Sequence, residues 1–169
     1  KGNYSGLFLR SAFGLIGIIC NFYAIDKLTI SDASLLNKLS PFFAVIFSIF
    51  ILKEIADRYE WTFVIVAFIG ALFVIKPTFS MEIIPAIAGV IGGMCAGLAY
   101  TFVRQLQSNG VKGPVIVLFF SAFSSIALLP NLIFNFTPMT FEQTLSLVMA
   151  GVSAAGGQFC ITAAYKNAP

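Results

Sequence analysis

Residues 23–54 read YAIDKLTISDASLLNKLSPFFAVIFSIFILKE, and this stretch decides the fold. It begins at the polar end of one apolar run, passes a short connection at Ser31 and Asp32, and continues as a second apolar run to Leu52. A helix needs about 20 mostly apolar residues to cross a hydrocarbon core of roughly 30 Å. The second run has that length, so the stretch predicts two membrane-spanning helices joined by a tight connection.

The rest of the chain repeats this pattern. Hydrophobic residues make up 59% of the 169 positions and charged residues only 10%, whereas soluble domains carry roughly a quarter charged residues. Helices are expected because lipid cannot pair with free backbone N–H and C=O groups. Six spans are predicted, at residues 6–25, 33–52, 59–75, 83–103, 115–134 and 145–165. The fold class that we predict is an all-α, polytopic membrane protein.

The composition argues against several function classes. The sequence has no histidine, and histidine is the commonest metal ligand and the usual general base near neutral pH. The three cysteines lie in apolar runs, so we expect them to be packing residues. The ten Lys and Arg residues are scattered rather than clustered as in nucleic-acid-binding proteins. We therefore expect no metal, no cofactor, no nucleic-acid partner and no enzymatic activity.

Basic residues gather at alternate connections between the predicted spans. Short loops rich in Lys and Arg are retained on the cytoplasmic side of a membrane. If the chain starts inside, only Lys27 and Lys76 lie outside. The inside set is Lys1, Arg10, Lys53, Arg58, Arg104, Lys112 and Lys166. We expect the loops at residues 53–58 and 104–112 to be cytoplasmic, in a cell inner membrane or plasma membrane.

The ends of the first and sixth predicted spans resemble each other. Residues 162–167 align with residues 23–28 and match them at one alanine and one lysine. Successive spans alternate in direction, so the first and the sixth run in opposite directions. The pattern indicates an inverted-topology repeat, a plan of many secondary transporters that places the substrate site near the midplane.

The opening stretch also resembles a known family. Ala33-Ser34 follows a short loop, Ser40-Pro41 lies in the next helix, and Leu52-Lys53-Glu54 ends that helix. This order is similar to the EamA-like members of the drug/metabolite transporter superfamily, which carry Leu-Gly-Glu at the last position. Lys53 replaces the glycine here.

The resemblance implies ten helices arranged as two inverted repeats of five. Residues 1–77 would supply the last three helices of the first repeat, and residues 78–169 the first three of the second. On this reading we expect the chain to be an internal segment of a longer protein, unable to transport on its own.

Lys38 lies about a turn and a half inside the second predicted span. A charge there costs roughly 2.5–3.5 kcal/mol on insertion scales, so we expect it to face a water-filled cavity and attract an anionic group of a solute. The alternative is that its ammonium snorkels to the membrane surface. Asn37 lies beside it, and Pro41 removes a backbone hydrogen bond, which predicts a kink with exposed carbonyls. The alternatives for these two are an interhelical hydrogen bond and a kink without function.

Other polar side chains lie at membrane depth. Asn21 and Gln158 are placed near the same height in the two inverted copies, where each is a candidate to bind a solute or to join two helices. Tyr23 and Tyr100 are further candidates, with a place in the interfacial aromatic belt as the alternative. Glycines recur at positions 89, 93 and 97, with Gly92 beside them, and predict close helix packing.

The function expected from these features is a secondary carrier, of the exporter type, that moves small metabolites such as amino acids or organic anions by alternating access. The expected partners are a small-molecule solute and membrane lipid. A second copy of the chain, in a homodimer, is a further candidate partner. A membrane-embedded enzyme would need paired acids or a histidine near an activated serine. A channel or structural subunit would need a polar stripe along one whole helix.

Overall fold

The computed structural model describes residues 3–53, 57–75 and 82–167. Within these residues the chain forms seven helices and no strand, which confirms the all-α fold class. The helices are α1 (Asn3–Lys27), α2 (Ile30–Asn37), α3 (Ser40–Ile51), α4 (Arg58–Ile75), α5 (Ile83–Ser108), α6 (Gly113–Phe134) and α7 (Phe141–Asn167).

Five helical segments of the described residues are long and apolar enough to cross a membrane. Four belong to α1, α5, α6 and α7, and the fifth is α2 with α3, taken together as Ile30–Ile51. The span predicted at 59–75 is helix α4, whose shorter apolar part is Trp61–Gly70. The chain is therefore a multi-pass membrane protein.

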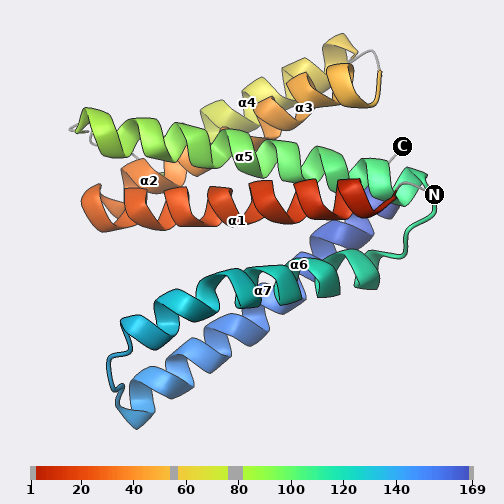
Figure 1. Ribbon diagram of the computed structural model, residues 1–169. Helices are drawn as coiled ribbons and strands as arrows, with labels where there is room; N and C mark the ends of the chain where they lie inside the picture. The colour runs from red at the N-terminus through yellow and green to blue at the C-terminus, as the bar shows by residue number, and fades with distance from the viewer. Residues whose placement is uncertain (1–2, 54–56, 76–81, 168–169) are drawn as a thin grey trace.

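Helices α1 and α5 run antiparallel through the centre of the bundle (Figure 1). Glycines bring them close: a Cβ atom on Gly17 would lie 3.2 Å from the carbonyl oxygen of Gly92, and a Cβ atom on Gly92 would lie 3.2 Å from that of Gly17. On α5, Gly93 approaches the carbonyl of Leu36 in α2. The close packing predicted from the glycine spacing is confirmed, and one helix uses it against several neighbours.

The second predicted span is interrupted at Lys38 and Leu39. Helix α2 ends at Asn37, Lys38 occupies the cap position, and α3 begins at Ser40 with Pro41 in its first turn. Pro41 has no N–H to donate to the Asn37 carbonyl, and its fixed φ suits the start of a new helix. The prediction of a disturbed helix near Pro41 is confirmed.

Helix α2 begins earlier than the sequence suggested, because Thr29 caps it. The backbone N–H of Asp32 donates to Thr29 Oγ1 at 3.2 Å, and Thr29 Oγ1 donates to Asp32 Oδ2 at 2.9 Å. Ser31 and Asp32 therefore lie inside the first turn and not in the connection before it. A side-chain acceptor at this position satisfies an N–H that the helix leaves free.

Thr29→Ala is expected to destabilise the protein by about 1 kcal/mol, since it removes this cap. The measurement is the melting temperature of the purified protein in detergent. Thr62→Ala is the matched control, because Thr62 Oγ1 donates only to the Arg58 carbonyl within an exposed helical turn. Equal melting temperatures for the two variants would contradict the assigned cap.

The departure from the family pattern falls on a strained backbone position at the end of α3. Lys53, which stands where EamA-like proteins carry glycine, follows the last turn of α3 with a φ of 57°. This left-handed conformation is the one that glycine adopts without strain after a helix. The glycine of the family pattern thus corresponds to a real backbone requirement here.

Helices α6 and α7 pack on each other and diverge from α1 and α5 away from the chain ends (Figure 1). Residues 125–157, which form their outer halves and connection, are exposed throughout. Only the inner parts of these helices, around Phe120 and Gln158, reach the α1–α5 pair. These inner parts close one side of the cavity described next.

Candidate functional site

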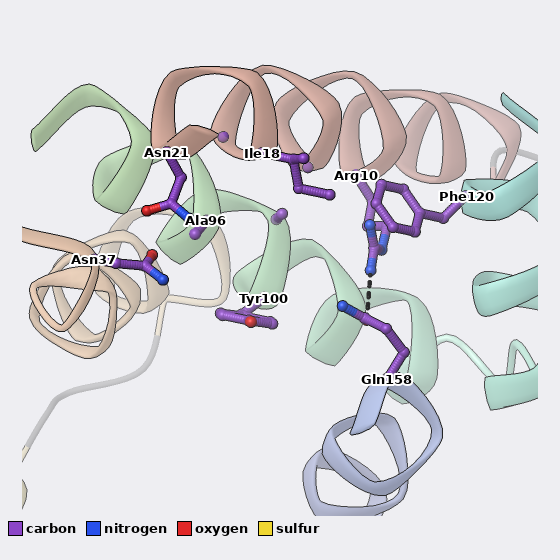
Figure 2. A pocket seen from close by; sticks show the side chains of 11 residues that line it. Arg10, Ile18, Asn21, Asn37, Ala96, Tyr100, Phe120 and Gln158 are labelled. Atoms are coloured by element: carbon purple, nitrogen blue, oxygen red, sulfur yellow. Dashed lines mark hydrogen bonds between the residues drawn. The ribbon is translucent and has the colours of Figure 1, made fainter. Parts of the chain in front are cut away.

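A cavity lies where α1, α2, α5, α6 and α7 meet. It has about 120 Å³ of space for the centres of water molecules, which is enough for several waters or a small polar group. Its lining mixes polar side chains with glycine, alanine and aromatic residues (Figure 2). The lining residues are Arg10, Gly14, Gly17, Ile18, Asn21, Asn37, Ala96, Ala99, Tyr100, Phe120 and Gln158.

Arg10 dominates one end of the cavity. Its side chain is only 2% exposed, and its Nη2 donates to Gln158 Oε1 at 3.2 Å. Its Cζ lies 3.8 Å from the ring centroid of Phe120, so the guanidinium stacks on the face of that ring (Figure 2). Such a cation–π contact is worth about 2 kcal/mol when desolvated. Two helices of the second half, α6 and α7, thus hold a cation supplied by α1.

Gly14 provides the room for this arrangement. A Cβ atom at position 14 would lie 2.7 Å from Arg10 Nη1 and 2.9 Å from Phe120 Cε2. Any larger residue would have to displace the guanidinium or the ring. Gly14 is one turn beyond Arg10 on the same face of α1, where the side chains of neighbouring turns meet.

The other end of the cavity carries two amides. Figure 2 shows Asn21 of α1 and Asn37 of α2 at this end, with Tyr100 of α5 between them and Gln158. The ring of Tyr100 stacks on that of Tyr165, with the centroids 5.8 Å apart. Tyr100 of α5 therefore contacts α7 as well as the cavity.

Four of the seven predicted site residues line this cavity, namely Asn21, Asn37, Tyr100 and Gln158. The expected equal height of Asn21 and Gln158 is wrong. Gln158 lies beside Arg10, and Asn21 follows Arg10 by three turns, or about 16 Å along α1 at 1.5 Å per residue. The two side chains mark different ends of one cavity.

The other three predicted residues lie elsewhere. Lys38 is exposed and, with Pro41, lines a separate apolar pocket beside α4. Consecutive residues of a helix point in different directions, so a cavity-facing Asn37 directs Lys38 away. Tyr23 is 43% exposed and is not part of the cavity lining. The prediction that Lys38 faces the same cavity as Asn37 is therefore wrong.

Sequence reasoning missed Arg10, which it treated as a helix-end residue of the cytoplasmic set. The structure places it well inside α1, eight positions into the helix. A signal was present: Arg10, Gly14, Gly17 and Asn21 are spaced by four, three and four residues. That spacing puts small and polar residues on one face of a helix, and this face lines the cavity.

Comparison with known proteins finds a family that the first part of the chain resembles. Residues 1–76 match the EamA-like transporter family. The chain is also 31% identical to the pseudopaline exporter CntI of Pseudomonas aeruginosa over 163 residues, which cover 95% of this chain and 57% of that protein. Over residues 1–76 the chain is similar to the EamA-like transporter family. No solved structure matches it.

Other relatives of this protein are more distant. An uncharacterized transporter of Helicobacter pylori is 26% identical over 176 residues, which cover all of this chain and 59% of that protein. Solute carrier family 35 member G1 of Mus musculus is 26% identical over 128 residues, or 76% of this chain and 31% of that protein. The chain thus spans less than two thirds of the length of these relatives.

Proposed function

We propose that the protein containing this chain is a secondary carrier that moves a small organic solute across a membrane. The solute would pass through the cavity that has Arg10 at one end and Asn21 at the other. The observation that carries the proposal is a polar cavity in the middle of an apolar helix bundle. Polar and charged groups are costly inside a membrane, so they mark solute pathways there. Similarity of residues 1–76 to the EamA-like family supports transport over catalysis or a purely structural role.

The cavity has the position expected of a carrier built from two inverted repeats. Helices α1 and α2 come from the proposed first repeat, residues 1–77, and α5, α6 and α7 come from the second, residues 78–169. Helices α1 and α7, whose ends resemble each other in sequence, run in opposite directions (Figure 1). Sites between inverted repeats are a recurring feature of secondary transporters.

The length of this chain relative to the Pseudomonas exporter supports a bundle of more helices in the whole protein. Six predicted spans in a segment that covers 57% of the Pseudomonas exporter scale to about ten spans over a chain of that length. We therefore propose ten helices in two repeats of five for the whole protein. Export is the proposed direction, because the relative with 31% identity is named an exporter.

The proposed membrane is a cell inner membrane or plasma membrane, with the loops at residues 53–58 and 104–112 facing the cytoplasm. In Figure 1 the start of α1, the end of α3 and the end of α5 lie at one end of the bundle. The basic residues Lys53, Arg58 and Lys112 occupy the connections at this end, whereas Lys27 lies at the opposite end. Retention of basic loops on the cytoplasmic side supports this orientation.

Proteoliposomes that contain the full-length protein test the proposal. The vesicles are loaded with an equimolar mixture of amino acids and organic acids, and mass spectrometry follows efflux. At least one solute is expected to leave faster than from protein-free vesicles. Gln158→Ala is expected to slow this flux by about tenfold or more, since a hydrogen bond to a charged group contributes about 1.5–3 kcal/mol.

Lys38→Ala is the matched control, because Lys38 lies outside the cavity lining. Its flux is expected to stay within about twofold of the unaltered protein at equal expression, well below the change that a lost charged hydrogen bond produces. Failure of every solute to move would contradict a carrier. An equal loss in the two variants would contradict the choice of cavity.

A further inference from the structure

Arg10 brings a positive charge into the cavity without a negative partner. Its guanidinium stays protonated in proteins, and only 2% of the residue is exposed. None of the carboxylates in the described parts of the chain forms an ion pair with it. Charged residues inside membrane bundles normally pair or line a pathway for charged solutes. The buried cation thus has no counter-ion among the described residues.

The hydrogen-bonding groups of Arg10 are also only partly used. A guanidinium has five N–H donors in a planar fork. Within the described residues, one of them donates to Gln158, whereas the buried Nε has no acceptor. The Gln158 amide accepts through its oxygen, which leaves its nitrogen as a donor toward a further acceptor. The Nη groups of Arg10 and the amide nitrogen of Gln158 therefore lie as donors at the same end of the cavity.

We propose that this end of the cavity binds a carboxylate group of the transported solute. The proposal rests on the carrier function above and names its substrate class. A carboxylate has two acceptor oxygens that match the guanidinium fork in a bidentate pair. Arg10 is the one charged side chain in the cavity lining, so a group with a single negative charge neutralises the site. A doubly charged phosphate leaves excess negative charge in an apolar bundle.

The side chains at the other end of the cavity indicate which groups the rest of the solute carries. The amide of Asn21 lies at the far end of the cavity, about 16 Å along α1 from Arg10. The amide of Asn37, from α2, lies at the same end (Figure 2). An amide both donates and accepts hydrogen bonds but carries no charge. The cavity thus offers a carboxylate site at one end and uncharged polar groups at the other.

Thermal stabilisation of the purified full-length protein tests this without measuring transport. The probes are short-chain carboxylic acids and amino acids, each matched with its primary amide, together with phenyl phosphate. Acids are expected to raise the melting temperature at lower concentrations than their amides or phenyl phosphate. In Arg10→Gln the concentration for half of this effect is expected to rise by about tenfold or more. Lys27→Gln is the control, since it removes the same charge from an exposed end of α1.

Gln158→Glu provides a second variant if Arg10→Gln does not fold. It places a carboxylate where Gln158 Oε1 now lies, 3.2 Å from Arg10 Nη2. We expect this internal ion pair to raise the melting temperature without ligand and to remove stabilisation by acids. Two results together would overturn the proposal: a lower melting temperature of Gln158→Glu than of the unaltered protein, and no stabilisation of the unaltered protein by any acid. They would show that the protein itself supplies the anion.

The two proposals fail in different ways. Stabilisation by amides equal to that by acids, or unchanged acid binding in Arg10→Gln, would overturn the carboxylate site but leave a carrier of neutral solutes. Acid binding that depends on Arg10, without flux of any bound acid, would support the carboxylate site and contradict the carrier.

Discussion

Gly97→Ala is expected to destabilise the protein by more than about 2 kcal/mol, because it forces α3 away from α5. A Cβ atom at position 97 would lie 2.7 Å from Phe43 Cβ, 2.8 Å from the Ala44 nitrogen and 2.8 Å from the Ser40 carbonyl oxygen. Two of these are backbone atoms, so no rotation of a side chain relieves the overlap. The hydrogen bond from Thr101 Oγ1 to the Ala44 carbonyl, at 3.3 Å, is expected to break as α3 moves.

The measurement is the melting temperature in detergent, with Gly89→Ala as the matched control on the same helix. A Cβ atom at position 89 would meet the Cδ1 methyl of Leu36 at 2.6 Å, and that methyl is the far end of a flexible side chain. Reorienting Leu36 relieves most of this overlap, so Gly89→Ala is expected to cost less than about 1.5 kcal/mol. A larger loss for Gly89→Ala than for Gly97→Ala would contradict the assigned α3–α5 packing.

These two glycines show how far the sequence predicts the fold. The apolar runs predict the helices because length and hydrophobicity are what a membrane selects. The glycine spacing predicts close packing, but it does not say that Gly92 meets α1 whereas Gly97 meets α3. That choice depends on how α2 and α3 separate at Lys38, and a sequence read as one span does not contain this geometry.

The candidate site was predictable in part for the same reason. Asn21, Tyr100 and Gln158 were found because polar residues are rare at membrane depth. Lys38 was overvalued because its depth was counted along an unbroken helix. Arg10 was undervalued because it lies only a few residues after the start of the apolar run, which suggested a helix end. Helix α1 begins at Asn3, so Arg10 lies about two turns inside it. The burial of a charge depends on the helices packed around it, here α6 and α7.

Arg10→Met combined with Gln158→Leu is expected to give a more stable protein that has lost its flux. Replacing a buried polar or ionic pair by apolar residues of similar volume is often neutral or stabilising, by about 1–4 kcal/mol. Here the pair is also incompletely satisfied, because Arg10 Nε has no acceptor among the described residues. Methionine retains the unbranched shape of the arginine stem beside Phe120, and it makes favourable sulfur–aromatic contacts.

Flux through the double variant is expected to fall by about 100-fold, because a charged hydrogen bond and its partner are removed together. Gln158→Leu alone separates the two effects, since it removes the one hydrogen bond that Arg10 makes to a described residue. The single variant is therefore expected to melt below the unaltered protein, and the double variant above it. Melting temperature and flux are measured on the same preparations. A double variant that is both less stable and inactive would make Arg10 a structural residue. Higher stability with lost flux means that the buried cation is maintained at a cost in stability, which is the expected property of a solute site.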